Sequence, residues 1–393
     1  MGGRRRGRGC MAMAAVAAAG LIGGTVAPLA AAPPASAALA PPGAFAWGDN
    51  EFGQIGNGSK ATPEFDTPLS VVLPAAVTQV AASQDEFTNA VLLATGKVEV
   101  WGSNAFSEAG PFTANPVLSP HLIDGLTGIT QIAVGGGHIL ALDSAGTVWA
   151  WGNNTYGQLG NGTTSSLPNA NPSPVPVPGI NGIVQIAAGG NFSFAIGGNG
   201  TIYAWGLNSS GQLGDGTTVS HDSPEAVPAL AGVSRLIAGD QTSYAIRPDG
   251  KLLSWGSSSG GLLGRGASQG FSATPAVVPG LTGVTQVASS AVATLVVADP
   301  GATMWSWGPN AGGESGDGTT SLHATPVKTS LTGVARVAVG RGPRLVQQPL
   351  RLPHVRAFRA QIQDITRRLR ADRRGVPQIL PQMRHVTLQR LER

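Results

Sequence analysis

Cysteine is almost absent from this sequence: Cys10 is the only one among 393 residues. It lies just before an apolar stretch that is typical of an export signal, so we expect it to be removed with that signal. The mature chain would then have no thiol. Disulfide bridges, zinc–cysteine sites and cysteine catalysis are therefore excluded.

Charged residues are also scarce, at 12% of the chain, which is about half of the usual quarter. No GxxxxGKS or GxxxxGKT phosphate loop, GxSxG elbow or HExxH zinc motif occurs, and no run of alternating aspartates suits calcium. By contrast, the 57 glycines are roughly twice the normal share. This composition favours short strands joined by tight turns, and we expect no catalytic residue, metal site or cofactor.

The net charge of +4 is unevenly distributed along the chain. Residues 41–340 hold 8 Lys+Arg against 18 Asp+Glu, whereas residues 341–393 hold 13 arginines against 3 acids. The pI of 9.6 would suggest a nucleic-acid partner. Because the long central part is acidic, we expect no nucleic-acid partner.

The N-terminus has the three parts of a secretory signal. Four arginines between residues 4 and 8 precede an apolar stretch from about residue 11 to 32, and Ala35-Ser36-Ala37 is a small-x-small cleavage pattern. We predict a signal peptide at 1–37, a short leader at 38–43 and a secreted mature chain without a transmembrane segment. An uncleaved segment that tethers the chain to a membrane is the alternative.

A Trp-Gly pair recurs six times, at steps of 54, 50, 54, 50 and 52 residues, and we call its tryptophans the frame tryptophans: Trp47, Trp101, Trp151, Trp205, Trp255 and Trp307. Each pair precedes a polar loop with a related sequence: GQIGNG (53–58), GQLGNG (157–162), GQLGDG (211–216), GLLGRG (261–266), GESGDG (313–318) and the divergent SEAGPF (107–112). A period near fifty residues is typical of one four-stranded propeller blade.

One repeat, residues 129–179, shows how a blade would be built. Three strands are predicted by the alternating segment ITQIAV and by the segments HILALD and TVWAWG. A fourth is expected near PSPVPVPG, where the prolines restrict it to an edge or to an irregular pairing. A turn glycine stands at a nearly fixed distance before each later frame tryptophan: Gly96, Gly146, Gly200, Gly250 and Gly301. This distance fixes the hairpin register. We expect the frame tryptophans to pack against the neighbouring blade.

The pattern WGxNxxGQLGxG, in six copies over residues 43–340, resembles the regulator of chromosome condensation repeat. That resemblance implies an all-β propeller of four-stranded antiparallel blades, usually seven. Here a half-repeat opens the series at residue 44 and another begins at Gly333, so six blades are visible if the halves combine. We assign the propeller to 44–340 and expect imperfect closure. Residues 341–393 are an arginine-rich tail, explained by a shifted reading frame or by disorder, with a nucleic-acid or membrane tail as the alternative.

Two kinds of residue are candidates for function. Aromatic side chains on binding loops are favoured at interfaces, which makes Phe52, Phe106 and Tyr156 candidates for partner binding, with packing under the loop turn as the alternative. His138 stands where Phe87, Phe192, Thr242 and Ala293 are its expected equivalents. Since no acid or nucleophile accompanies it, we expect a structural role, as we do for the Asn-Gly and Asp-Gly turns.

These observations predict a secreted, non-catalytic scaffold that binds a protein or cell-envelope ligand, and we expect it to be a monomer. The resemblance implies two alternatives. One is inhibition of a secreted or envelope enzyme such as a beta-lactamase, as in a secreted bacterial relative. The other is a regulator that resembles a guanine-nucleotide exchange factor.

Overall fold

Strands dominate the computed structural model, which describes residues 44–60, 65–83, 87–111, 114–165, 171–338 and 345–347. Five four-stranded antiparallel sheets follow each other along the chain: β3 (Val77–Ala82), β4 (Thr88–Leu93), β5 (Val98–Gly102) and β6 (Val117–Leu122); β7 (Ile129–Val134), β8 (His138–Asp143), β9 (Val148–Gly152) and β10 (Asn171–Pro176); β11 (Ile183–Ala188), β12 (Phe192–Gly197), β13 (Ile202–Gly206) and β14 (His221–Ala226); β15 (Arg235–Ala238), β16 (Thr242–Ile246), β17 (Leu252–Ser257) and β18 (Phe271–Val277); β19 (Gln286–Ser289), β20 (Thr294–Ala298), β21 (Thr303–Gly308) and β22 (His323–Lys328).

The remaining elements are two short sheets and two single 3-10 turns. The sheets are β1 (Phe45–Gly48) with β2 (Phe65–Ser70) and β23 (Arg336–Ala338) with β24 (Leu345–Gln347), and the turns are η1 (Pro228–Leu230) and η2 (Ser259–Gly261). Within the described residues, no helix is long and apolar enough to span a bilayer.

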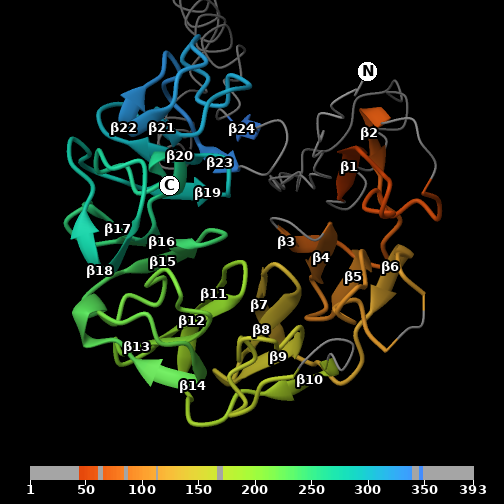
Figure 1. The fold of residues 1–393 in the computed structure, drawn as a ribbon. Coiled ribbons are helices and arrows are strands. Elements are labelled where there is room, and N and C mark those ends of the chain that lie inside the picture. Colours follow the sequence, from red (N-terminus) through yellow and green to blue (C-terminus); the bar gives the residue numbers. More distant parts are fainter. Residues whose placement is uncertain are drawn as a thin grey trace, which may run out of the picture. The chain divides into compact units, whose positions relative to one another are not determined.

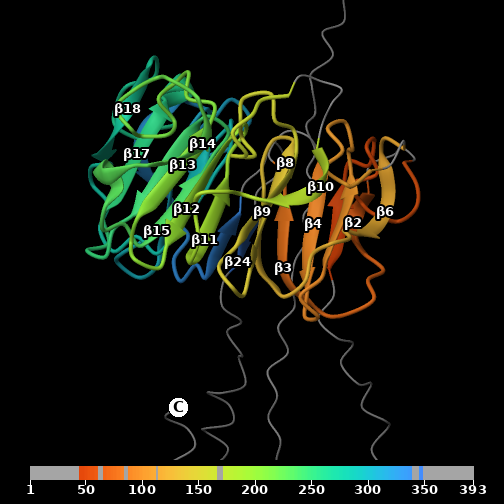
Figure 2. The same cartoon turned by 90° about the horizontal axis from the view of Figure 1, so that it is seen from below.

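The five full sheets are the blades of a β-propeller, in the order of the chain (Figure 1). We number the strands of each blade one to four along the sequence. First strands of successive blades touch, β3 with β7, β7 with β11 and so on to β23, so strand one is innermost. In the blades that Figure 2 labels, the long axes of the strands run in roughly the same direction. The predicted fold of four-stranded antiparallel blades is therefore confirmed.

Hairpin register follows the turn glycines, as predicted. Gly96, Gly146, Gly200, Gly250 and Gly301 have φ between +73° and +82°, a left-handed conformation that glycine adopts without steric cost. Strand two then pairs with strand three so that His138 lies opposite Gly152 and Thr242 opposite Gly256.

Each apolar cluster of the core lies between two successive blades. One such cluster joins two neighbouring blades. It contains Leu140, Ala150 and Leu159 of one blade and Ile186, Ala195 and Trp205 of the next. Because strands are covered on both sides, they are apolar in both phases of the alternation. Burial of these inter-blade faces holds the sheets together.

The frame tryptophans connect each blade to the one before it, which confirms the expected direction of their side chains. Their indole Nε1 atoms donate to backbone carbonyls of the preceding loop: Trp101 to Gln54 at 3.0 Å, Trp151 to Glu108 at 2.8 Å, Trp205 to Gln158 at 2.9 Å, Trp255 to Gln212 at 2.9 Å and Trp307 to Leu262 at 2.7 Å. These five indoles are fully buried, whereas Trp47 is half-buried.

A second connection runs along the innermost strands. The Gln79 side chain donates from Nε2 to the Ile132 carbonyl at 2.8 Å and accepts from the Ile132 N–H at 2.9 Å. Gln185 pairs in the same way with Leu236. A side-chain amide thereby replaces the backbone ladder that separate sheets cannot form. Arg235 occupies the corresponding place in the next blade, and its side chain is exposed.

Every outer strand contains a proline near the same register: Pro68, Pro120, Pro174, Pro224, Pro275 and Pro326. Proline has no N–H to offer to another strand, which is why it is tolerated at a sheet edge. The predicted edge position of the fourth strand is confirmed.

The two half-units form separate sheets rather than one blade. Among the described residues, no hydrogen-bonded ladder joins β1–β2 to β23–β24, in agreement with the expected imperfect closure. The strand β24 lies inside the arginine-rich tail, for which we expected a shifted reading frame or disorder, and its three residues pair with β23. The rest of the tail, the predicted signal peptide and the predicted leader lie outside the described residues.

Candidate functional site

The loops between strands three and four share one end of the blades with the turns between strands one and two. We call this end the loop face, and the opposite end, where strand two turns into strand three, the hairpin face. Loops built on a regular scaffold are common carriers of function. The loop face is therefore the first place to search for a site.

An asparagine three residues after the frame tryptophan organises most of these loops. In the Trp151 blade, Asn154 Oδ1 accepts from the Leu159 N–H at 3.0 Å, and its Nδ2 donates to Asn161 Oδ1 at 3.1 Å and to the Thr163 carbonyl at 2.9 Å. The same Oδ1 bond recurs at Asn50, Asn104, Asn208 and Asn310. These internal bonds give the loop face a defined conformation.

The three aromatic candidates lie on these loops but in different surroundings. Phe52 stacks on Phe87 of the next blade, with ring centroids 4.6 Å apart and an interplanar angle of 5°. Phe106 lies against Gly137 of the next blade, where a Cβ atom would come within 2.4 Å of its ring. Both rings are half-buried, whereas Tyr156 is 42% exposed. Their role in partner binding stays a prediction.

Three further apolar side chains on the loop face were not identified as candidates from the sequence. Val219, Phe271 and Leu322 are 62%, 56% and 50% exposed, each within two residues of the start of strand four in its own blade. Together with Tyr156 they place one exposed apolar side chain on each of four successive blades, and we call this set the apolar rim. The only sequence signal is a single apolar residue within a polar loop, which is too weak to identify it.

Charge on the loop face is mainly negative. Its described residues include seven acids, against two bases, Lys60 and Arg265; the acids are Asp49, Glu51, Glu108, Asp215, Asp240, Glu314 and Asp317. Two of the aspartates contact a histidine, Asp215 with His221 at 3.0 Å and Asp317 with His323 at 2.8 Å.

Asp317 illustrates how these carboxylates are held. Hydrogen bonds from the Thr319 backbone and hydroxyl hold the pKa of Asp317 below its ordinary value. The carboxylate is therefore charged at neutral pH and contributes to the acidic character of the face.

His138 is a buried structural residue, as expected from its isolation in the sequence. Its side chain is inaccessible, its Nε2 lies 2.9 Å from Ser193 Oγ of the next blade, and burial lowers its pKa to about 3. One expected equivalence is wrong. Gly102 pairs with Thr88 as Gly152 pairs with His138, so the equivalent is Thr88 rather than Phe87. The glycine run that marks this turn before His138 is missing before Thr88.

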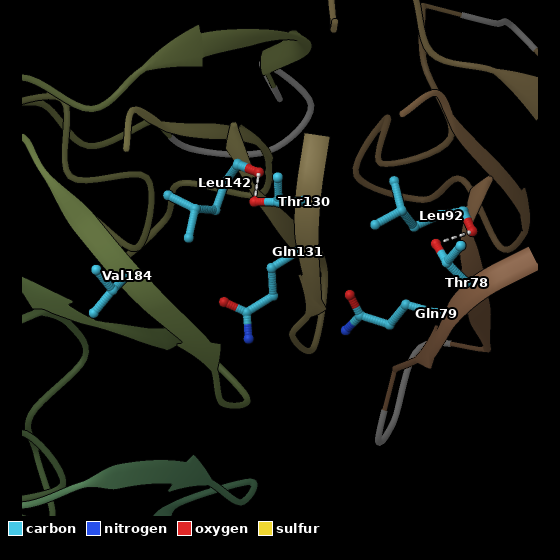
Figure 3. A pocket seen from close by; sticks show the side chains of 7 residues that line it. All are labelled: Thr78, Gln79, Leu92, Thr130, Gln131, Leu142 and Val184. Atoms are coloured by element: carbon cyan, nitrogen blue, oxygen red, sulfur yellow. Dashed lines mark hydrogen bonds between the residues drawn. The ribbon is translucent and has the colours of Figure 1, made fainter. Parts of the chain in front are cut away.

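A cavity of about 490 Å³ lies at the innermost strands of three blades (Figure 3). It is lined by Thr78, Gln79, Leu92, Thr130, Gln131, Leu142 and Val184. The hydroxyls of Thr78 and Thr130 donate to strand-two carbonyls of their own blades at 3.1 Å, and the glutamines contact the following blade. These polar groups serve blade packing. Elsewhere in the described part of the chain, no cluster of three or more His, Cys, Asp or Glu is placed to hold a metal ion.

Comparison with known proteins agrees with this architecture. The family model of the RCC1-like domain matches residues 15–345. Human HERC2, an E3 ubiquitin-protein ligase, is 35% identical over 189 residues, which are 47% of this chain and 4% of that protein. Rat HERC4, a probable E3 ubiquitin-protein ligase, is 34% identical over 178 residues, 44% of this chain and 16% of that protein. The chain thus spans a small part of these relatives.

Solved structures are similar in fold. Yeast RCC1 (Prp20) bound to Kap60 superposes with a TM-score of 0.68 at 23% identity, covering 81% of this chain and 79% of that chain. Human WBSCR16 gives a TM-score of 0.67 at 23% identity, covering 78% and 82%. At this identity the likeness concerns the fold alone.

Proposed function

Because the chain belongs to the RCC1-like domain family, we propose that it is a non-catalytic scaffold whose loop face binds a protein partner. The observation that carries this proposal is the apolar rim. Tyr156, Val219, Phe271 and Leu322 are between 42% and 62% exposed on loops of four successive blades. Exposed apolar side chains also occur at the hairpin end, for example Val72 and Val277, but the two most exposed aromatic rings of the described residues, Tyr156 and Phe271, lie on the loop face. Aromatic side chains are enriched at interface hot spots.

The construction of the loop face supports the same conclusion. Three of the four loops that carry the apolar rim are fixed by the asparagine network, at Asn154, Asn208 and Asn310, so little conformational entropy would be lost there when a partner binds. Acidic residues lie on the same face as the apolar rim, and a mixture of apolar and polar side chains is typical of a protein–protein interface. We propose that the partner is met outside the cell, after removal of residues 1–37.

Site-specific crosslinking tests the face that binds. A photoreactive phenylalanine analogue replaces Tyr156 in one variant and Val277 in another, because Val277 is 44% exposed but lies at the hairpin end of β18. We expect a crosslinked protein from the Tyr156 variant only, using culture medium and cell envelope as the source. Equal crosslinking from Val277 would contradict the proposal.

A binding measurement with the crosslinked protein completes the test. Phe271→Ser installs the residue type found at the equivalent Ser220, so the fold should tolerate it. We expect this variant and Tyr156→Ala to bind at least about tenfold more weakly, as is usual for exposed aromatic anchors. Unchanged affinity in both would argue against the rim. Mass spectrometry of the mature protein tests secretion, with Ala38 expected as its first residue.

A further inference from the structure

One loop departs from the pattern that the others share. Ten residues after the frame tryptophan, four loops carry a side chain that accepts hydrogen bonds: Asn57, Asn161, Asp215 and Asp317. Each accepts from the backbone N–H and hydroxyl two residues further on. The Trp255 blade has Arg265 at this position. A guanidinium has only donors and cannot replace these bonds.

The same blade has also lost the asparagine that organises the loop, since Ser258 stands in its place. The Ser258 hydroxyl donates to the Ala267 carbonyl at 2.8 Å, and its N–H donates to the Gly270 carbonyl at 2.8 Å. This loop is therefore closed without help from Arg265. Arg265 therefore does not take part in the loop-closing hydrogen bonds that the residue at its position accepts in other blades.

The position of the Arg265 side chain is energetically unfavourable. Its Nε is buried and has no hydrogen-bond partner, and no acidic side chain of the described residues lies within ion-pair distance. Burial lowers the pKa of its guanidinium. A buried donor without an acceptor is unfavourable, because it has lost its hydrogen bonds to water without replacing them. An anion bound at the terminal guanidinium nitrogens, which are not among the buried unpaired atoms, would compensate the unpaired charge.

The surroundings indicate what kind of anion would reach it. Phe271, 56% exposed, stands on the same loop, and arginine together with an exposed aromatic residue is typical of a binding hot spot. Lys60 is the other base of the described loop face, on a distant blade. The acidic residues elsewhere on this face would repel a ligand with many negative charges. The anion must therefore be a single negative group on a ligand that is not acidic as a whole.

We infer that Arg265 is the anchor for one carboxylate side chain of the bound protein, which its planar guanidinium would hold by paired N–H···O bonds. The source of the carboxylate rests on the proposed function, whereas the presence of an anion site at Arg265 does not. The site would also determine how the partner is oriented, since a single base within an acidic face gives one favourable register.

Nitrogen NMR of the arginine side chains tests the anion site directly. Arg265→Asn installs the residue of Asn57 and Asn161, and the Nε–H signal missing from its spectrum identifies Arg265. We expect this signal to shift saturably when acetyl-Ala-Ala-Glu-Ala amide, which carries a single carboxylate, is added, and to be unaffected by the matched glutamine peptide, acetyl-Ala-Ala-Gln-Ala amide. No shift, an equal shift with the glutamine peptide, or a shift at lower concentration with inorganic phosphate would overturn the carboxylate assignment.

Affinity for the crosslinked partner tests the role of the site. We expect Arg265→Asn to weaken binding by about tenfold or more and Arg265→Lys to restore only part of it, because lysine lacks the planar fork. Arg247→Asn is the matched control, since Arg247 is paired with Asp249 at 3.5 Å on the hairpin face. Melting curves establish that all variants are folded.

The two proposals fail separately. If Tyr156 crosslinks a partner whose affinity is unchanged by Arg265→Asn, the carboxylate anchor is wrong and the scaffold function stands. If the Arg265 signal titrates with the glutamate peptide but no partner crosslinks at Tyr156, the anion site stands and the scaffold function is wrong.

Discussion

Replacing Trp205 by phenylalanine isolates the contribution of the contact between a frame tryptophan and the preceding blade. The Trp205 indole is fully buried and donates to the Gln158 carbonyl at 2.9 Å. The same carbonyl also accepts from Ser193 Oγ at 2.9 Å, so it stays satisfied in the variant. The loss is then one net hydrogen bond, about 1 kcal/mol, plus the space left by the smaller ring, about 1–2 kcal/mol.

We therefore expect Trp205→Phe to lower the free energy of unfolding by about 2–3 kcal/mol. Trp47→Phe is the matched control, because Trp47 is half-buried, and we expect it to cost less than about 1 kcal/mol. Urea unfolding followed by circular dichroism measures both without depending on tryptophan fluorescence. Equal losses in the two variants would refute the idea that contact with the preceding blade distinguishes them.

Three more predictions concern stability, the last of them with its own control substitution. Glu99 is buried, and burial raises its pKa above 4.5, so its stabilising contribution is complete below that pH and is lost as pH rises through the raised pKa. We therefore expect Glu99→Gln to be more stable than the native chain at pH 7 but not at pH 4. Identical differences at both pH values in urea titrations would contradict this. Arg235→Gln restores the inter-blade amide contact seen at Gln185, and we expect a gain of about 1 kcal/mol; a lower melting temperature would count against it. Gly160→Ala places a Cβ 2.8 Å from an indole nitrogen at φ +68°, whereas Gly179→Ala meets nothing within 4 Å at φ +78°; calorimetry should show the first to be less stable by at least about 1 kcal/mol, because both carry the strain of positive φ but only one has a clash.

The blades could be predicted from the sequence because their determinants are local. A glycine five residues before a tryptophan sets a hairpin, and one hairpin period repeats without help from distant residues. The direction of the frame tryptophans followed from the same alternation. The start of the second strand was misplaced at Phe87 because adjacent Phe and Thr both suit a strand, and only its pairing with Gly102 decides between them.

The candidate site was less predictable because exposure depends on neighbours. Phe52 and Tyr156 occupy the same place in their repeats, yet Phe87 covers only the first of them, 35 residues further along the chain. Val219 and Leu322 are isolated in polar loops, so no periodicity distinguishes them. The change from acceptor to donor at Arg265 is visible in the sequence, but its buried, unpaired Nε is a property of the folded loop alone.

The prolines of the outer strands have a consequence for how a chain of near-identical units folds. Six segments of similar sequence compete for each other's partners, and a fourth strand that accepted a neighbour's first strand would merge two blades into one continuous sheet. With Pro120, Pro174 or Pro224 near its centre, a fourth strand presents an interrupted edge to that neighbour. Each blade therefore stops growing at four strands, and the next one starts as a separate sheet. Proline thus limits each sheet to four strands, and it keeps the repeats from pairing with one another while the chain folds.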